Sequence, residues 1–249
     1  MSLNEGLLLY LFPEGVPAWL YFGCLFFVLL ISYMLGSVNT AIIVSRVLYK
    51  EDIRKKGSGN AGLTNMLRVY GKRAAVLTLV GDIMKAAVSI FISGLLFGFV
   101  YRAAISTNHI LYFSAALVAI GHVFPCFYRF KGGKGVLVTS TAALILSPYI
   151  FLGLLLLFVA IVAISKYVSL GSVSVAILYP VALNFYFRFA LRFVVDGVEY
   201  AGQVNFGVAL ASMILACLIV WCHRENLKRI GNRTENKLSF KKKSKDEEN

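Results

Sequence analysis

The sequence predicts an all-α, polytopic membrane protein with seven transmembrane helices. Of the 249 residues, 59% are hydrophobic, whereas a soluble domain is closer to half apolar. Several apolar runs approach the roughly 20 residues that a helix needs to cross a bilayer. The 25 Lys and Arg outnumber the 12 Asp and Glu, and they gather between the apolar runs, as the positive-inside rule describes.

The apolar runs place the spans in order along the chain. Residues 1–17 contain no basic residue, so they do not have the positive region of a secretory signal peptide. The run at 135–146 is short for a crossing, and Ser147-Pro148 separates it from the next run because proline interrupts a helix. The expected spans cover residues 18–35, 74–100, 110–121, 135–146, 149–165, 170–187 and 206–222.

The distribution of charge predicts the orientation. With seven spans, 21 of the 25 Lys and Arg fall on one side, in Arg46–Arg73, Arg129–Lys134, Lys166 and the segment after Cys222. The positive-inside rule therefore puts the N-terminus outside and the C-terminus in the cytoplasm. A single helix over 135–165 would turn the basic tail outward, against that rule. Residues 1–237 are expected to form one integral-membrane domain, and residues 238–249 a basic, disordered tail near anionic lipid.

Composition also excludes several function classes. The net charge of +13 fits cytoplasmic loops and anionic lipid better than nucleic acid. The four cysteines form no CxxC pair, and they indicate reduced thiols and no metal site. There is no Ser-His-Asp spacing, no HEXXH and no complete Walker A motif, because Lys134 is followed by glycine. We expect neither a metal nor a cofactor.

The stretch FKGGKGV, residues 130–136, carries three glycines and two lysines between two apolar segments. Glycines let the backbone present successive N–H groups to an anion, and a helix expected just after Lys134 adds the favourable end of its dipole. Lys131, Gly132, Gly133 and Lys134 are therefore candidate phosphate-binding residues. The alternative is an ordinary basic cytoplasmic turn.

The second glycine-rich stretch is GSGNAGLTN, residues 57–65. On the predicted topology it shares the cytoplasmic side with FKGGKGV, with Ser169 and with the segment His223–Asn226. Because residues three apart share a helix face, His223 and Asn226 are expected to lie together. Hydroxyl, amide and cationic groups of this kind suit one or two phosphate esters. The binding candidates here are Ser58, Gly59, Asn60, Asn65, Arg68 and Ser169.

Three polar residues near or within the spans allow two interpretations each. Asp82 and Lys85 lie three residues apart in the second span, where charges are usually functional, but an internal ion pair that joins helices explains them equally well. His122, at a helix end, is either a cap for backbone groups or a catalytic residue.

Four stretches resemble one known family, the bacterial acyl-phosphate:glycerol-3-phosphate acyltransferases called PlsY. They are Gly36-Ser37 with Thr40-Ala41, GSGNAGLTN at 57–65, GHVFPCFYRFKGGKGV at 121–136 and HRENLKRI at 223–230. The similarity runs from about Leu30 to Lys237, and the third stretch is the most specific. One departure is Asn39, which stands where the family usually has proline.

The resemblance implies a seven-helix enzyme of the bacterial cell membrane with its active site facing the cytoplasm. It implies acyl transfer from acyl phosphate to the 1-hydroxyl of sn-glycerol 3-phosphate, which gives lysophosphatidic acid and phosphate, the first acylation step of phospholipid synthesis. The partners would be these two substrates, membrane lipid and the soluble enzyme that makes acyl phosphate. By the same resemblance the substrate site contains Ser58, Arg68, Lys134, Ser169, His223 and Asn226, of which we expect Lys134, His223 and Asn226 to be catalytic.

The competing interpretation is a membrane transporter of a phosphorylated metabolite or lipid. A transporter places its site near the midplane, often between inverted repeats. The polar motifs here are predicted on one face and no repeat is visible, which favours the enzyme.

Overall fold

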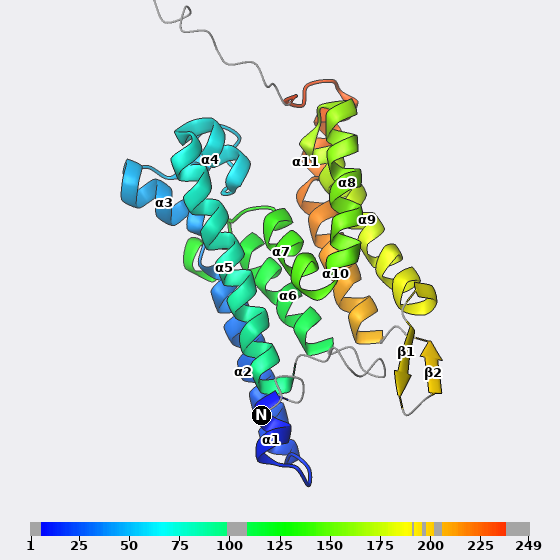
Figure 1. Ribbon diagram of the computed structural model, residues 1–249. Helices are drawn as coiled ribbons and strands as arrows, with labels where there is room; N and C mark the ends of the chain where they lie inside the picture. The colour runs from blue at the N-terminus through cyan, green and yellow to red at the C-terminus, as the bar shows by residue number, and fades with distance from the viewer. Residues whose placement is uncertain (1–5, 99–108, 191, 196–197, 202–205, 238–249) are drawn as a thin grey trace, which may run out of the picture.

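The computed structural model describes residues 6–98, 109–190, 192–195, 198–201 and 206–237, so the tail expected over 238–249 lies outside the described residues. The chain forms a bundle of long helices with short helices at both ends (Figure 1). The helices are α1 (Gly6–Leu11), α2 (Ala18–Ser37), α3 (Thr40–Tyr49), α4 (Leu63–Tyr70), α5 (Lys72–Phe97), α6 (His109–Val123), α7 (Val136–Leu146), α8 (Pro148–Ser165), α9 (Val168–Phe185), α10 (Phe206–Cys222) and α11 (Arg224–Gly231).

Each of the expected spans corresponds to a helix of the bundle. Among the described residues, five helical segments are long and apolar enough to cross a membrane, or six if α10 and α11, which meet at a 50° bend, count as one. Helix α7 has 11 residues, about 16 Å at the helical rise of 1.5 Å per residue, and the hydrocarbon core is roughly 30 Å thick. The structure thus supports a multi-pass membrane protein with five to six clear spans.

A two-stranded antiparallel hairpin is the departure from the all-α expectation. Strand β1 (Arg192–Val195) pairs with β2 (Val198–Ala201), with Arg192 opposite Ala201 and Val195 opposite Val198. Both strands contain β-branched and aromatic residues, which favour extended backbone. The intervening sequence Asp196-Gly197 is a common hairpin signal. Figure 1 shows the hairpin at the end of the bundle away from α4 and α11.

The helix is interrupted between α2 and α3, although the proline usual in the family at this position is replaced by Asn39. Helix α2 ends at Ser37 and α3 begins at Thr40, and the Asn39 side chain accepts a hydrogen bond from the N–H of Ile42 at 3.1 Å. Asparagine is among the preferred residues at this capping position. The asparagine therefore supports the same break that a proline would impose.

Small residues let α2 and α6 cross closely. A Cβ atom on Gly36 would overlap the carbonyl oxygen of Val118, and one on Gly121 would overlap the carbonyl oxygen of Tyr33. Helix α5 joins the same group through buried serine pairs, Ser89 with Ser32 at 2.8 Å and Ser93 with Ser114 at 2.7 Å. Close backbone approach and interhelical hydrogen bonds are typical of helix packing in membranes.

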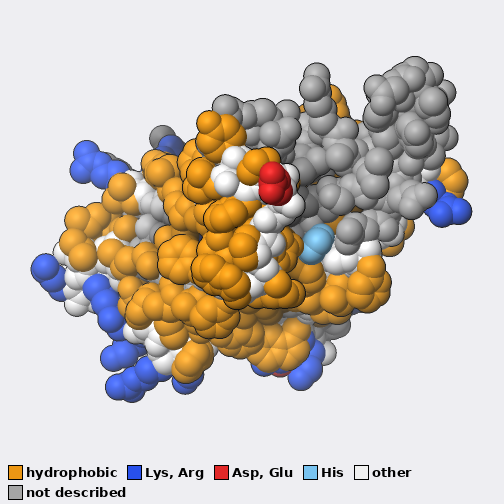
Figure 2. Space-filling model, turned by 90° about the horizontal axis from the view of Figure 1, so that it is seen from below, with side chains coloured by type: hydrophobic (Ala, Val, Ile, Leu, Met, Phe, Trp, Pro, Cys, Tyr) orange, Lys and Arg blue, Asp and Glu red, His pale blue; other side chains and the backbone are white. Residues whose placement is uncertain are grey.

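The outside of the bundle is apolar, as a surface in contact with lipid requires. Seen from below, the described surface is mostly hydrophobic, with Lys and Arg side chains mainly around its margin (Figure 2). Large apolar side chains remain exposed on the outer helices, among them Trp19 on α2, Leu156 and Ile164 on α8 and Phe206 on α10. In water such a surface would aggregate, whereas in a bilayer it is solvated.

The crossing of α2 and α6 gives a test of the packing. Gly36→Ala should destabilise the fold by about 1–3 kcal/mol, the usual cost of overpacking, and should lower the Tm in detergent by several degrees. Gly23→Ala on the same helix is the control, because nothing lies within 4 Å of a Cβ there. A thermal unfolding scan that shows equal Tm values for the two variants would contradict the close crossing.

Candidate active site

A cavity of about 900 Å³ opens between the loops and the helices at the end of the bundle that carries α4 and α11. Its polar end is lined by most of residues 58–68, by Gly132 and residues 134–136, by Ser169 at the start of α9, and by residues on and after α11. Its other end is apolar and lies among α7, α8, α9 and α10. The sequence-predicted residues that line it are Ser58, Gly59, Asn60, Asn65, Arg68, Gly132, Lys134, Ser169, His223 and Asn226.

Asn65 shapes the loop that precedes α4. Its Oδ1 accepts a hydrogen bond from the N–H of Ser58 at 2.9 Å, and its Nδ2 donates to the carbonyl oxygens of Lys56 and Asn60, both at 3.0 Å. The side chain is buried and its hydrogen bonds are made within the loop. Asn65 therefore holds Ser58 and Asn60 at the cavity, and it is a positioning residue more than a direct ligand.

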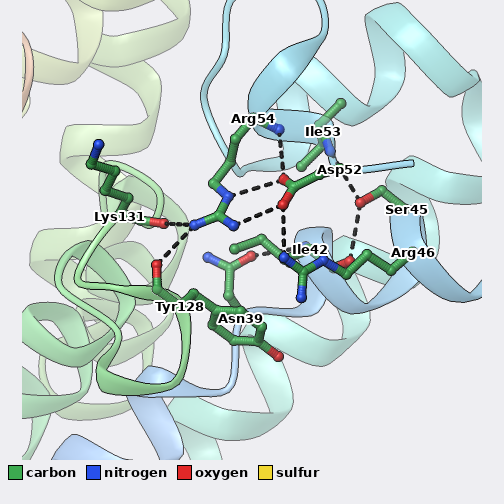
Figure 3. A network of polar contacts seen from close by, with 9 residues as sticks. All are labelled: Asn39, Ile42, Ser45, Arg46, Asp52, Ile53, Arg54, Tyr128 and Lys131. Carbon is green, nitrogen blue, oxygen red and sulfur yellow. Dashed lines mark hydrogen bonds and ion pairs between the residues drawn. The ribbon is translucent and has the colours of Figure 1, made fainter. Parts of the chain in front are cut away.

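Arg54 joins this loop to the loop that follows α6 (Figure 3). Its Nη1 donates to the carbonyl oxygens of Tyr128 at 2.8 Å and Lys131 at 3.1 Å. The other edge of the guanidinium forms a two-pronged ion pair with Asp52, at 2.9 and 2.7 Å. The hydrogen bonds from Arg54 hold the pKa of Asp52 well below its usual range, so the pair stays charged at neutral pH. The two glycine-rich motifs are thereby fixed relative to each other.

The side chain of Lys131 does not line the cavity. It is exposed, and Figure 3 shows its ammonium directed away from the Arg54 network while its carbonyl takes part in it. The two lysines of FKGGKGV therefore differ: only Lys134 faces the cavity.

The expected amide cradle at Gly132 and Gly133 needs revision. The N–H of Gly132 donates to the carbonyl oxygen of Val123 at 3.0 Å, and the N–H of Gly133 donates to that of His122 at 3.1 Å. A Cβ atom at either position would overlap His122, so these glycines allow close packing of the loop on α6. The pairing across the loop was not visible in the sequence, where both amides looked free.

The start of α7 is a second candidate for an anion-binding site. Gly135 and Val136 line the cavity, and no side chain caps this helix. The first N–H groups of a helix have no partner within the helix and attract anions. The candidate site for a phosphate or an oxyanion therefore moves from the amides of Gly132 and Gly133 to the first turn of α7.

Lys134 and Asn226 meet across the cavity, from positions 92 residues apart in the chain. The Lys134 ammonium donates a short hydrogen bond to Asn226 Oδ1, and Asn226 Nδ2 donates to Ser169 Oγ at 3.0 Å. Burial lowers the pKa of Lys134 to about 8, which leaves it mostly charged at pH 7. Three residues predicted from separate motifs are thus joined in one network.

Arg68 and His223 line the same polar end. The Arg68 guanidinium makes no hydrogen bond or ion pair with another described residue, so it is available to an anion. His223 is buried, and its Nδ1 lies 2.8 Å from the carbonyl oxygen of Ile219. A carbonyl only accepts, so Nδ1 carries the proton and Nε2 is left as an acceptor. Burial lowers the pKa of His223 to about 4, so the ring is neutral at pH 7.

Glu235 and Arg229 belong to this network, and the sequence-based prediction missed both. Glu235 Oε1 accepts hydrogen bonds from Asn226 Nδ2 at 2.6 Å and Ser169 Oγ at 2.8 Å, and Oε2 accepts from Arg229 Nε at 2.7 Å. Although burial opposes ionisation, the hydrogen bonds from Asn226, Arg229 and Ser169 lower the pKa of Glu235. In the sequence Glu235 is a single acidic residue in a basic segment, which gives no signal of a site.

Asp82, Lys85 and His122, for which the sequence allowed two interpretations each, form a buried network beside the cavity. The Lys85 ammonium lies 2.8 Å from Asp82 Oδ1 and 2.8 Å from His122 Nδ1, and it donates to the carbonyl oxygen of Val38 at 3.1 Å. Asp82 and His122 line the cavity. The ion-pair interpretation of Asp82 and Lys85 therefore has direct structural support, since the pair joins α5, α6 and the break after α2.

Comparison with known proteins gives one consistent result. The family model described as glycerol-3-phosphate acyltransferase matches residues 26–233. Similar curated proteins include the glycerol-3-phosphate acyltransferases of Syntrophomonas wolfei, 36% identical over 86% of this chain and 96% of that protein, and of Clostridioides difficile, 37% identical over 85% and 94%.

Solved structures agree with the sequence comparison. The glycerol 3-phosphate form of PlsY (YgiH), an integral membrane glycerol 3-phosphate acyltransferase, is 28% identical, with a TM-score of 0.72 over 86% of this chain and 96% of that one. The lysophosphatidic acid form of PlsY has a TM-score of 0.69 at 27% identity, over 86% and 95% of the two chains.

Arg54 gives a test of how the site is held. Arg54→Lys keeps the charge but loses the planar fork that binds Asp52 and two carbonyl oxygens together. Hydrogen bonds to charged groups contribute roughly 1.5–3 kcal/mol each, so we expect kcat/KM to fall at least about tenfold. Arg46→Lys is the matched control, because Arg46 also pairs with Asp52, at 2.8 Å, but it touches the second loop only through the face of the Tyr128 ring, 5.6 Å from its guanidinium carbon, among the contacts of the described residues. An equal loss in both variants would contradict the bridging role of Arg54.

Proposed function

The chain belongs to the glycerol-3-phosphate acyltransferase family and is an acyltransferase, and we propose that it takes the acyl group from acyl phosphate. In this reaction the 1-hydroxyl of sn-glycerol 3-phosphate attacks the acyl carbonyl carbon. The bond from that carbon to the phosphate oxygen breaks, and the products are lysophosphatidic acid and inorganic phosphate.

The observation that carries the proposal is that one cavity has two chemically different ends. The polar end contains the cations Lys134 and Arg68 and the amide donors at the start of α7. The apolar end is lined by Ala143, Phe151, Leu154, Phe158, Val175, Ala176 and Leu215. A phosphate group suits the first end and an acyl chain suits the second, so a molecule that carries both fits the whole cavity.

Binding and orientation account for most of the chemistry. Acyl phosphate is a mixed anhydride, so its carbonyl is already activated and the protein mainly has to hold two anionic substrates in line and exclude water. We assign Arg68 and Lys134 to phosphate, and Ser58, Ser169 and Asn226 to phosphate oxygens and glycerol hydroxyls. The amides at the start of α7 stabilise the oxyanion of the tetrahedral intermediate.

The proton of the attacking hydroxyl goes to a phosphate oxygen of the substrate in this proposal. Neutral His223, with Nε2 free to accept, is the protein group that supplies an alternative route. No covalent acyl-enzyme is required, because the leaving group of acyl phosphate departs without one.

We further propose that the protein lies in a bacterial cell membrane with seven spans, its N-terminus outside and the polar end of the cavity facing the cytoplasm. The positive-inside rule supports this orientation. The residues that line the polar end come from the segments around α4 and α11, which are rich in Lys and Arg, and these two helices lie at the same end of the bundle (Figure 1). The gathering of the polar groups at one end of the cavity also favours an enzyme over the transporter alternative, whose site would lie at the midplane.

The donor is tested with purified protein in detergent and labelled glycerol 3-phosphate. Acyl phosphate, acyl-CoA and acyl-carrier protein loaded with an acyl group are offered separately, with and without a metal chelator. We expect product only from acyl phosphate, and no effect of the chelator, because the leaving group needs no metal. Turnover with acyl-CoA alone would overturn the proposed donor. The same assay in sealed membrane vesicles of both orientations tests on which side the site opens.

Lys134 is expected to contact a substrate phosphate. Lys134→Ala removes a charge-assisted hydrogen bond worth roughly 1.5–3 kcal/mol, so kcat/KM should fall about ten- to a hundredfold or more. Lys134→Arg should restore activity only in part, since a planar fork replaces a compact charge. Lys131→Ala is the control, because its side chain lies outside the cavity. If steady-state kinetics show the same loss for both alanine variants, Lys134 has no special role.

A further inference from the structure

The carboxylate of Glu235 lies among the groups that the proposed function assigns to a substrate phosphate. We infer that Glu235 occupies the position of the phosphate of glycerol 3-phosphate, and that the two anions compete for it. Glu235 then sets the affinity of the enzyme for its acceptor. This inference rests on the proposed function and adds to it a residue that lies beyond the family match, which ends at residue 233.

The contacts of Glu235 are those of a bound anion. Three donors converge on its two oxygens, from Asn226 at 2.6 Å, Ser169 at 2.8 Å and Arg229 at 2.7 Å. Asn226 is itself bonded to Lys134, so a second cation of the cavity, besides Arg229, is one side chain away from the carboxylate. A phosphate monoester is recognised by the same combination of hydroxyl, amide and cationic donors. The carboxylate thus uses donors that a phosphate would need.

The backbone after α11 holds Glu235 in this place. Helix α11 ends at Gly231, Arg233 has a positive φ of 57°, and the N–H groups of Thr234 and Glu235 donate to the carbonyl oxygen of Arg229 at 2.8 and 3.2 Å. The chain therefore turns back toward the cavity, where Asn236 and Lys237 also contribute to the lining. Because these hydrogen bonds lie in a short turn, the turn can release the side chain without unfolding a helix.

Charge makes simultaneous occupancy unfavourable. Two anions at hydrogen-bonding distance from the same donors repel each other strongly where water is partly excluded. Glycerol 3-phosphate must therefore displace Glu235, and its apparent Kd equals the intrinsic Kd divided by the fraction of molecules in which the carboxylate has left the site. Displacement frees Ser169, Asn226 and Arg229 together, so Arg229 becomes a phosphate ligand when Glu235 leaves.

Binding without turnover tests the inference. The full chain in detergent is titrated with glycerol 3-phosphate by calorimetry in the absence of any acyl donor. Glu235→Gln keeps the shape of the side chain but removes its charge, and charge-assisted hydrogen bonds are about twice as strong as neutral ones. We expect the Kd to fall about tenfold, and the KM for glycerol 3-phosphate to fall by a similar factor. Glu51→Gln, which changes an exposed carboxylate outside the cavity, should leave the Kd unchanged.

The possible outcomes separate the inference from the function. A Kd for Glu235→Gln that equals or exceeds that of the wild type overturns the inference while the proposed function stands. A lower KM for acyl phosphate alone also overturns it, because the carboxylate then competes with the donor. If neither wild type nor any variant binds glycerol 3-phosphate, the proposed function fails first. Glu235→Asp, whose carboxylate is withdrawn by one methylene, should give an intermediate Kd, and it serves as the second variant if Glu235→Gln does not fold.

Discussion

One guanidinium holds together the two loops on which the polar end of the cavity depends. Arg54 reaches from the turn before the first glycine-rich loop to carbonyl oxygens 74 and 77 residues further along the chain. Because Asp52 fixes the same guanidinium from the other side, it has little freedom to turn. Ser58 on the first loop, Arg68 on the helix α4 that follows it, and Lys134 on the second loop keep their mutual distance through this contact. Without it, the candidate ligands would belong to two independent loops.

A second constraint is the interruption of helix inside the bundle. The break between α2 and α3 leaves carbonyl oxygens without helical partners, a costly arrangement where water is absent. The Lys85 ammonium meets the carbonyl oxygens of Val38 at 3.1 Å and Gly36 at 3.4 Å, and Asp82 balances its charge. A buried charge is tolerated only when it is paired and hydrogen-bonded. The ion pair therefore stabilises the break between α2 and α3, and through Asp82 it also forms part of the cavity wall.

The helices and the residues that line the site were predicted better from the sequence than the contacts between those residues. The apolar runs predicted where the helices lie. The distribution of Lys and Arg predicted that Lys134, Ser169 and Asn226 lie on the same side of the membrane. The amides of Gly132 and Gly133 looked free because their partners, the carbonyls of Val123 and His122, lie at the end of α6 and only the fold of the loop brings them together. Glu235 was missed because only the fold after α11 returns it to the cavity. The hairpin was missed although its sequence contains the Asp-Gly signal, because each flanking strand has only four residues.

The apolar end of the cavity reaches a helix that faces lipid. Leu155 lines the cavity and is 40% exposed, and its neighbour Leu156 is 73% exposed. On the proposed function, the acceptor arrives from water and the product carries a long alkyl chain. Each methylene gains about 0.8 kcal/mol on leaving water, so the product partitions sideways into the leaflet and does not return through the aqueous mouth. Product inhibition would then follow the amount of product in the membrane, independent of the volume of the surrounding solution.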